Sequence, residues 1–194
     1  MVPAPNAPTR ERSQPYTQAR IMTADADATT IVLTGFMGTG KSTIGRLLAQ
    51  RLGRDFVDTD ELIEARHGPI PGIFAAHGED GFRSLERRLA EELGCGTGIV
   101  VATGGRFMLD PANRAAMEPG ARVFCLEADV DEILRRVLAH GVDRPLLAGP
   151  DPAARIAELL DERAAGYAAF EQVPTGGRSP AEIVDDIIAR LDET

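Results

Sequence analysis

The sequence lacks the features of a membrane, secreted or metal-cluster protein. No run of apolar residues approaches the roughly 20 that are needed to span a bilayer. Cysteine occurs twice, at Cys95 and Cys125, in unrelated contexts and without the spacing of metal ligands. We therefore expect two buried free thiols in the reducing cytoplasm and no association with a membrane.

Positive charge is also scarce, because the sequence has 21 Lys and Arg but 30 Asp and Glu, which gives a net charge of −9. Nucleic acids and acidic membranes need a basic face on their partner, so we expect neither as a ligand. A small anionic substrate is still possible, since a few clustered arginines can bind it within an acidic protein. The length of 194 residues indicates one domain.

The first 28 residues differ from the rest of the chain. They contain Pro3, Pro5, Pro8 and Pro15, show no apolar periodicity and lack the apolar central region of a secretory signal. We predict a disordered tail over residues 1–28 and a single folded domain over 29–194. The sequence leaves open whether Met1 or Met22 is the true start.

The most informative stretch is residues 35–42, which match the phosphate-binding pattern G-x-x-x-x-G-K-[ST]. An apolar β-branched run at 30–34 precedes it and helical spacing at 44–52 follows it, as this motif requires. A glycine-rich turn without function would not need that context. The residues predicted to hold a nucleoside triphosphate are Gly38, Thr39, Gly40, Lys41, Ser42 and Thr43. Lys41 can bridge the outer phosphates, and the Ser42 hydroxyl can bind Mg²⁺.

Apolar runs alternate with helical patterns along the rest of the chain. We predict further strands at 55–58, 99–102 and 123–126 and a last strand near 170–175 that its proline shortens. Helices are expected at 60–67, 80–93, 113–118, 130–138, 152–167 and 180–191, with breakers at 68–72, a helical turn at 73–76 and a loop at 140–152. This alternation predicts a three-layer α/β/α sandwich with a mostly parallel five-stranded sheet, the P-loop NTPase fold.

Several polar residues fall where ligands gather in such folds. Asp58 and Asp60 follow the second strand, where one carboxylate can hold Mg²⁺ and the other can accept a proton from a substrate. The pattern is explained equally well if Asp60 only caps its helix and Asp58 is solvated. Thr103-Gly104-Gly105 ends another strand and offers backbone N–H groups to an anion, unless it is only a tight turn. Arg144 lies in the Gly/Pro-rich loop and can close over the triphosphate, unless it is a solvated arginine.

Arg163 is in line with the apolar stripe of its predicted helix. A buried guanidinium needs an anionic partner, because unpaired burial costs several kcal/mol. The spacing leaves two partners equally open: a structural carboxylate such as Glu86, or the carboxylate of a substrate. Arg83, considered by itself, fits a solvated helix position.

Six motifs in this order resemble the shikimate kinase family of the nucleoside monophosphate kinase-like group. They are Gly-Phe-Met-Gly-Thr-Gly-Lys-Ser at 35–42, Asp-Thr-Asp at 58–60, Phe-Arg-Ser-Leu-Glu at 82–86, Ala-Thr-Gly-Gly at 102–105, Arg-Pro-Leu-Leu at 144–147 and Glu-Arg at 162–163 with Tyr167. The resemblance extends from about Ile31 to Leu191. It implies an enzyme that uses ATP and Mg²⁺ to phosphorylate the 3-hydroxyl of shikimate in aromatic amino-acid biosynthesis. We also expect the protein to be a cytoplasmic monomer.

The resemblance also implies roles for the candidate residues. Those that act on the nucleotide are Lys41 and Arg144 at the transferring phosphoryl group, Ser42 and Asp58 at Mg²⁺, and Arg178 beside adenine. Those that act on shikimate are Asp60 as hydroxyl ligand and base, Arg83 and Arg163 at the carboxylate with Glu86 orienting Arg83, and Gly105 through its backbone.

The chain departs from the family pattern at Arg106, where a third glycine is usual. A positive φ there would strain the arginine, whereas a relaxed Arg106 would add positive charge beside the anion site. Two alternatives to a shikimate kinase are a related kinase of another hydroxy-acid such as gluconate and a sensor that binds ligand without turnover. The retained Lys41, Asp60 and Arg144 disfavour the sensor.

Overall fold

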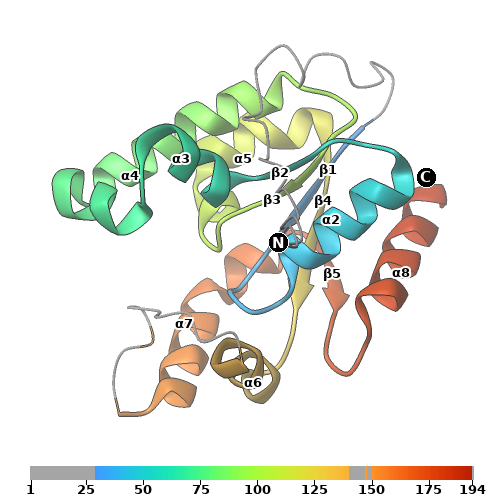
Figure 1. The fold of residues 1–194 in the computed structure, drawn as a ribbon. Helices are drawn as coiled ribbons and strands as arrows, with labels where there is room; N and C mark the ends of the chain where they lie inside the picture. Colours follow the sequence, from blue (N-terminus) through green and yellow to red (C-terminus); the bar gives the residue numbers. More distant parts are fainter. Residues whose placement is uncertain (1–28, 140–146, 148–149, 194) are drawn as a thin grey trace, which may run out of the picture.

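The computed structural model describes residues 29–139, 147 and 150–193. In this part of the chain, a sheet of five parallel strands has the order β2-β3-β1-β4-β5 (Figure 1). The strands are β1 (Thr30–Gly35), β2 (Phe56–Asp58), β3 (Val100–Ala102), β4 (Ala121–Glu127) and β5 (Glu171–Pro174). The predicted sheet is confirmed, and it is parallel throughout. Its order places β1, and the glycine loop after it, at the centre.

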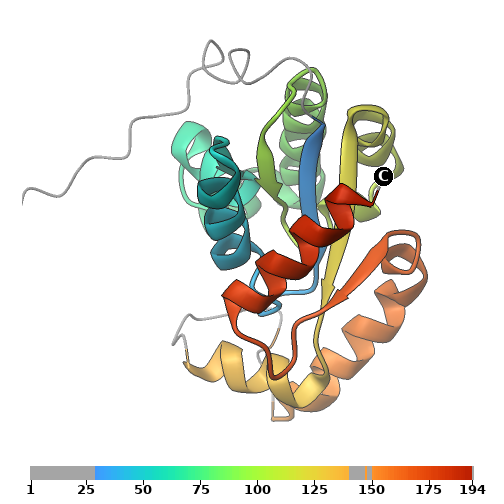
Figure 2. The same cartoon turned by 90° about the vertical axis from the view of Figure 1, so that its right-hand side faces the viewer.

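Helices cover both faces of the sheet, as Figures 1 and 2 show. Leu33 of β1 packs with α2 (Lys41–Leu52) and α8 (Pro180–Asp192) on one face. Val32 faces the other core, which is built from α3 (Thr59–His67), α4 (Ile70–Gly94), α5 (Pro111–Met117), α6 (Val130–Ala139) and α7 (Pro152–Tyr167). Short 3₁₀ helices occupy Phe107–Leu109 and Glu118–Gly120. Burial of both faces explains why the strands read as continuous apolar runs.

The segment after α3 is more helical than the sequence indicated. We expected residues 68–72 to break the chain and 73–76 to form only a turn, but α4 already begins at Ile70 and is kinked at Gly78, with φ 67° and ψ −173°. Proline is tolerated in the first turn of a helix, because its missing N–H has no intrahelical partner there. Pro71 therefore starts a helix where it was expected to stop one.

The last strand is short, as predicted, and ends at its proline. β5 pairs Glu171–Pro174 with residues 124–127 of β4. Pro174 lies at the end of an edge strand, where a missing N–H leaves no partner unsatisfied. The loop after β5 is thereby held at the carboxyl end of the sheet, next to the glycine loop.

One of the two predicted buried thiols is not buried. Cys125 lies in the sheet, but Cys95 is exposed where α4 ends, and both are free.

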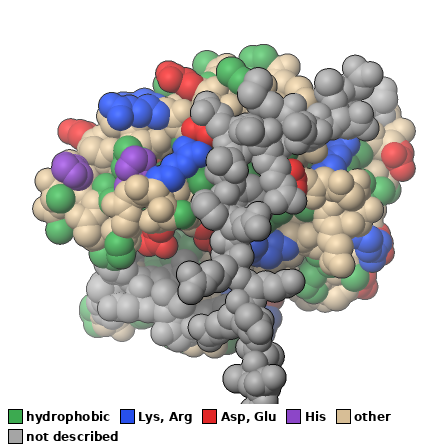
Figure 3. Space-filling model, turned by 45° about the horizontal axis from the view of Figure 1, so that its top comes forward, with side chains coloured by type: hydrophobic (Ala, Val, Ile, Leu, Met, Phe, Trp, Pro, Cys, Tyr) green, Lys and Arg blue, Asp and Glu red, His purple; other side chains and the backbone are tan. Residues whose placement is uncertain are grey.

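On the face drawn in Figure 3, basic and acidic side chains are interspersed over the surface. None of the helices in the described part of the chain is long and apolar enough to cross a bilayer.

Candidate active site

A cleft of about 660 Å³ opens at the carboxyl ends of the central strands. Its walls combine the glycine loop, the two aspartates and the glycine turn after β3, which the sequence had singled out separately. The lining residues with polar groups or glycine backbone are Gly38, Thr39, Gly40, Lys41, Ser42, Thr43, Asp58, Asp60, Thr103, Gly104, Gly105, Glu132, Arg135, Arg136 and Arg178. The parallel topology explains the gathering, because all these loops leave the sheet at the same edge.

The glycine loop has the conformation that phosphate binding requires. Gly40, directly before α2, has φ 97°, a value that side chains rarely allow, so its backbone can turn into the helix N-terminus. Thr39 Oγ1 donates to the Phe36 carbonyl at 2.8 Å and closes the turn. Lys41 Nζ lies over the same loop and donates to the carbonyls of Gly35 and Phe36 at 2.9 and 2.8 Å.

Asp58 links β2, α3 and the glycine loop. Its Oδ2 accepts a hydrogen bond from Ser42 Oγ at 2.6 Å, while Oδ1 accepts from the backbone N–H groups of Asp60 and Glu61. Asp58 is therefore the N-cap of α3. The alternative that Asp60 caps this helix while Asp58 is solvated is wrong. Two oxygen donors meet at the end of the loop, which is the donor chemistry that Mg²⁺ prefers.

Asp60 carries a perturbed carboxyl group. Burial, followed by repulsion from nearby Asp58, raises the pKa of Asp60 to about 6, against the opposing attraction of Lys41. A carboxylate with a pKa close to neutrality is ionised at pH 7 and still basic enough to take a proton. Because Asp58 holds the helix cap, the Asp60 side chain is free to face the cleft.

The glycine turn fits closely against Asp60. A Cβ on Gly104 would lie 2.6 Å from Asp60 Oδ1, so any side chain there would displace the carboxylate. The Gly104 N–H donates to Thr59 Oγ1 at 2.9 Å, and it is therefore not one of the free anion donors that the sequence suggested. Arg106 has φ −108°, so the departure from a third glycine causes no backbone strain.

Arg83 is held by two carboxylates. Its Nη1 donates to Glu86 Oε2 at 2.6 Å, and its Nε and Nη2 donate to Glu79 Oε1 at 3.2 and 2.9 Å. Glu86 is 1% exposed, and Arg83 is largely covered, so the solvated position expected for Arg83 by itself is wrong. Arg106 donates to the same Glu79 oxygen at 3.0 Å from the exposed side.

Arg163 is held quite differently. It is 8% exposed, and no carboxylate of the described residues forms an ion pair with it. Glu86, the structural partner that the sequence left open, pairs with Arg83 instead. The Arg163 Cζ lies 5.2 Å from the centre of the Phe36 ring, and its Nη1 is 3.7 Å from the position of a Cβ on Gly105. A covered cation therefore borders the turn that lines the cleft.

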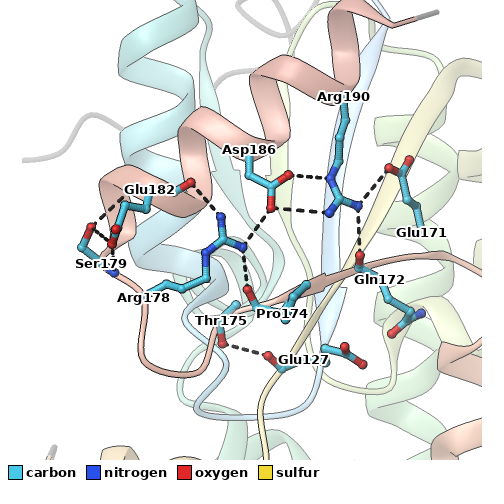
Figure 4. Close-up of polar contacts among 10 residues, drawn as sticks. All are labelled: Glu127, Glu171, Gln172, Pro174, Thr175, Arg178, Ser179, Glu182, Asp186 and Arg190. Carbon is cyan, nitrogen blue, oxygen red and sulfur yellow. Dashed lines mark hydrogen bonds and ion pairs between the residues drawn. The ribbon is translucent and has the colours of Figure 1, made fainter.

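Arg178 lines the cleft from the loop before α8, and its guanidinium is fixed (Figure 4). It donates to the Pro174 carbonyl, the Glu182 carbonyl and Asp186 Oδ2 at 3.0, 3.0 and 2.8 Å. Asp186 also binds Arg190, which reaches Glu171 of β5. The loop expected beside adenine is thus braced against both β5 and α8.

The sequence reasoning missed Arg136. This side chain connects the glycine loop to the loop after β5. It donates to the Thr175 hydroxyl and carbonyl at 3.0 and 2.8 Å and to the Gly38 carbonyl at 3.2 Å. The available signal was the Arg135-Arg136 pair in the helix after a buried strand, which resembles a solvated charge run. Arg144, predicted to close over the triphosphate, lies outside the described residues.

The central glycine loop, its lysine and the surrounding parallel sheet define a protein of the P-loop nucleotide-binding class. Comparison with protein families narrows this class. The model of the family described as "Shikimate kinase" matches residues 37–192, and the chain belongs to that family. It is accordingly a kinase, and the enzyme class expected from the sequence is confirmed.

Individual relatives agree with this assignment. The shikimate kinase of Symbiobacterium thermophilum is 43% identical over 167 residues, which cover 84% of this chain and 96% of that one. A shikimate kinase from Acinetobacter baumannii, solved in complex with shikimate, superposes with a TM-score of 0.79 and 32% identity over 91% of this chain and 98% of the other. A gluconokinase from Sinorhizobium meliloti reaches a TM-score of 0.59 at 21% identity, over 85% of this chain and 92% of the other, and shares the fold.

Proposed function

We propose that the chain transfers the γ-phosphoryl group of ATP to the 3-hydroxyl of shikimate. The observation that supports an acid as the substrate is the position of Arg163. Its guanidinium is buried beside the cleft-lining turn at Gly105, and no carboxylate of the described residues forms an ion pair with it. Such a charge is stable if an anion meets it, and a carboxylate supplies a bidentate partner. Arg83 would contribute a second contact to the same carboxylate, oriented by Glu86, and the Gly105 backbone would also contact the substrate.

Asp60 would accept the proton in this reaction. The hydroxyl oxygen of shikimate bonds to the γ-phosphorus, the bond to the bridging oxygen of ADP breaks, and the hydroxyl proton passes to the Asp60 carboxylate. Lys41 and Arg144 would stabilise the charge on the moving phosphoryl group. Arg178 would border the adenine, which would lie at the braced loop before α8.

The residues present fit a magnesium ion at the end of the glycine loop. Ser42 Oγ and Asp58 Oδ2 are already 2.6 Å apart and would bind Mg²⁺ directly or through water. The ion would neutralise charge on the β- and γ-phosphates. We further propose that the enzyme is a monomer in the cytoplasm.

A coupled ADP-release assay with shikimate, quinate and gluconate, each offered separately, tests the proposal. We expect turnover with shikimate to exceed the others by at least about tenfold, since the carboxylate site and Asp60 must be satisfied together. Lys41→Met is the control and should abolish transfer to every acceptor. Preferred phosphorylation of gluconate would overturn the assignment of shikimate while leaving the kinase class intact.

A further inference from the structure

Tyr167 lies one helical turn after Arg163 on α7 and is only 7% exposed. Its hydroxyl donates to the Gly105 carbonyl at 2.6 Å. The neighbouring Arg163 guanidinium opposes the rise in the pKa of Tyr167 that burial causes. Arg163 Nη1 and the Tyr167 hydroxyl lie 3.7 and 3.9 Å from the position of a Cβ on Gly105, so both border the turn that lines the cleft.

The Phe36 ring completes this arrangement. It is 1% exposed, belongs to the glycine loop and lies under the Arg163 guanidinium at 5.2 Å. A guanidinium on an aromatic face keeps its charge and its edge donors, because the ring satisfies none of them. Phe36 and Tyr167, here called the aromatic bracket, therefore hold Arg163 without neutralising it.

We propose that Tyr167 is a positioning residue for the acid-binding end of the site: its hydroxyl fixes the Arg163 guanidinium relative to Gly105, so that both meet the substrate carboxylate in register. This inference rests on the proposed function. A carboxylate in the same place would pair with Arg163 permanently and compete with substrate. A neutral hydroxyl orients the guanidinium and leaves its charge to the ligand.

Tyr167→Phe tests the inference, because it removes one oxygen and keeps the ring. We expect the KM for shikimate to rise about 3- to 10-fold, as for loss of one hydrogen bond, with kcat and the KM for ATP changed by less than about twofold. In an Arg163→Ala background the same substitution should have no further effect on the KM. Phe36→Leu provides a second variant, whose effect on the KM for shikimate should also disappear without Arg163.

Thr30→Val is the matched control. Thr30 is 2% exposed and its hydroxyl donates to the Gly96 carbonyl at 3.3 Å, at the end of β1 away from the cleft. It should lower the thermal midpoint to an extent similar to Tyr167→Phe and leave the KM for shikimate unchanged.

The outcomes separate the two proposals. If Arg163→Ala leaves the KM for shikimate unchanged, the acid site of the proposed function is wrong. If Arg163→Ala raises the KM and Tyr167→Phe only lowers the thermal midpoint, Tyr167 is structural and the inference is overturned. An equal effect of Tyr167→Phe with and without Arg163 would overturn it as well.

Discussion

The two arginines predicted to bind the substrate, Arg83 and Arg163, have opposite surroundings. Arg83 is bound by the carboxylates of Glu86 and Glu79, so its charge is balanced within the protein. Arg163 lies on the Phe36 ring beside the Tyr167 hydroxyl, and no described carboxylate pairs with it. The difference suggests a division of labour. We propose that Arg83 contributes mainly to the stability of the fold, and that Arg163 supplies most of the charge that attracts an acid.

The largest effect on catalysis is expected at Asp60, and the effects of substituting the two arginines can be compared with it. Asp60→Asn should lower kcat with shikimate by about 100- to 10,000-fold, because an amide cannot accept the proton. Nucleotide binding, measured by titration with ATP, should persist. Turnover close to that of the unmodified enzyme would remove Asp60 as the base.

Arg83→Ala should mainly destabilise the protein. Glu86 is 1% exposed and would lose its charged partner, so we expect the free energy of unfolding in urea to fall by about 3 kcal/mol. Arg87→Ala is the control, since its ion pair with Asp110 leaves the Arg87 side chain half exposed and should contribute less than about 1 kcal/mol. Equal losses in the two variants would argue against a structural role for Arg83.

Arg163→Ala should show the reverse pattern. Loss of a charge-assisted contact of roughly 1.5–3 kcal/mol raises the KM for shikimate about 10- to 150-fold. The free energy of unfolding should change by less than about 1 kcal/mol, because no described carboxylate loses its partner. If this variant is destabilised as much as Arg83→Ala, the comparison between the two arginines fails.

The pH dependence of stability isolates Asp60. Its folded-state pKa of about 6 lies above the ordinary value of 3.8, so the folded protein binds more protons between these values and the free energy of unfolding falls as pH rises through them. Asp60→Asn should therefore be more stable than the unmodified protein by roughly 1–3 kcal/mol at pH 8. The two should converge near pH 4. A difference that does not depend on pH would contradict the raised pKa.

Arg106→Gly should have the smallest effect. Arg106 reaches Glu79 from a half-exposed position, and such pairs contribute less than about 1 kcal/mol. Arg83 keeps its bond to Glu86, so the KM for shikimate should change by less than about twofold. A larger increase would mean that Arg106 adds to the charge of the acid site.

The sequence predicted local features better than distant contacts. The glycine loop and the parallel sheet follow from spacing and strand apolarity, and both are confirmed. The close approach of Gly104 to Asp60 and the bonds from Arg136 to Thr175 join segments that the sequence separates by 44 and 39 residues. Spacing within one element cannot indicate such contacts. The same limit left open whether Glu86 is the partner of Arg163, and in the structure Glu86 pairs with Arg83 instead.

Lys41 has a practical consequence, because it is the sole lysine in the sequence. Apart from the amino terminus, an acylating reagent finds one primary amine in the whole chain, and that amine rests on the carbonyls of Gly35 and Phe36. Nucleotide in the cleft would shield it. The extent of acylation at this one site, measured by mass spectrometry, would thus report the fraction of enzyme molecules without bound nucleotide.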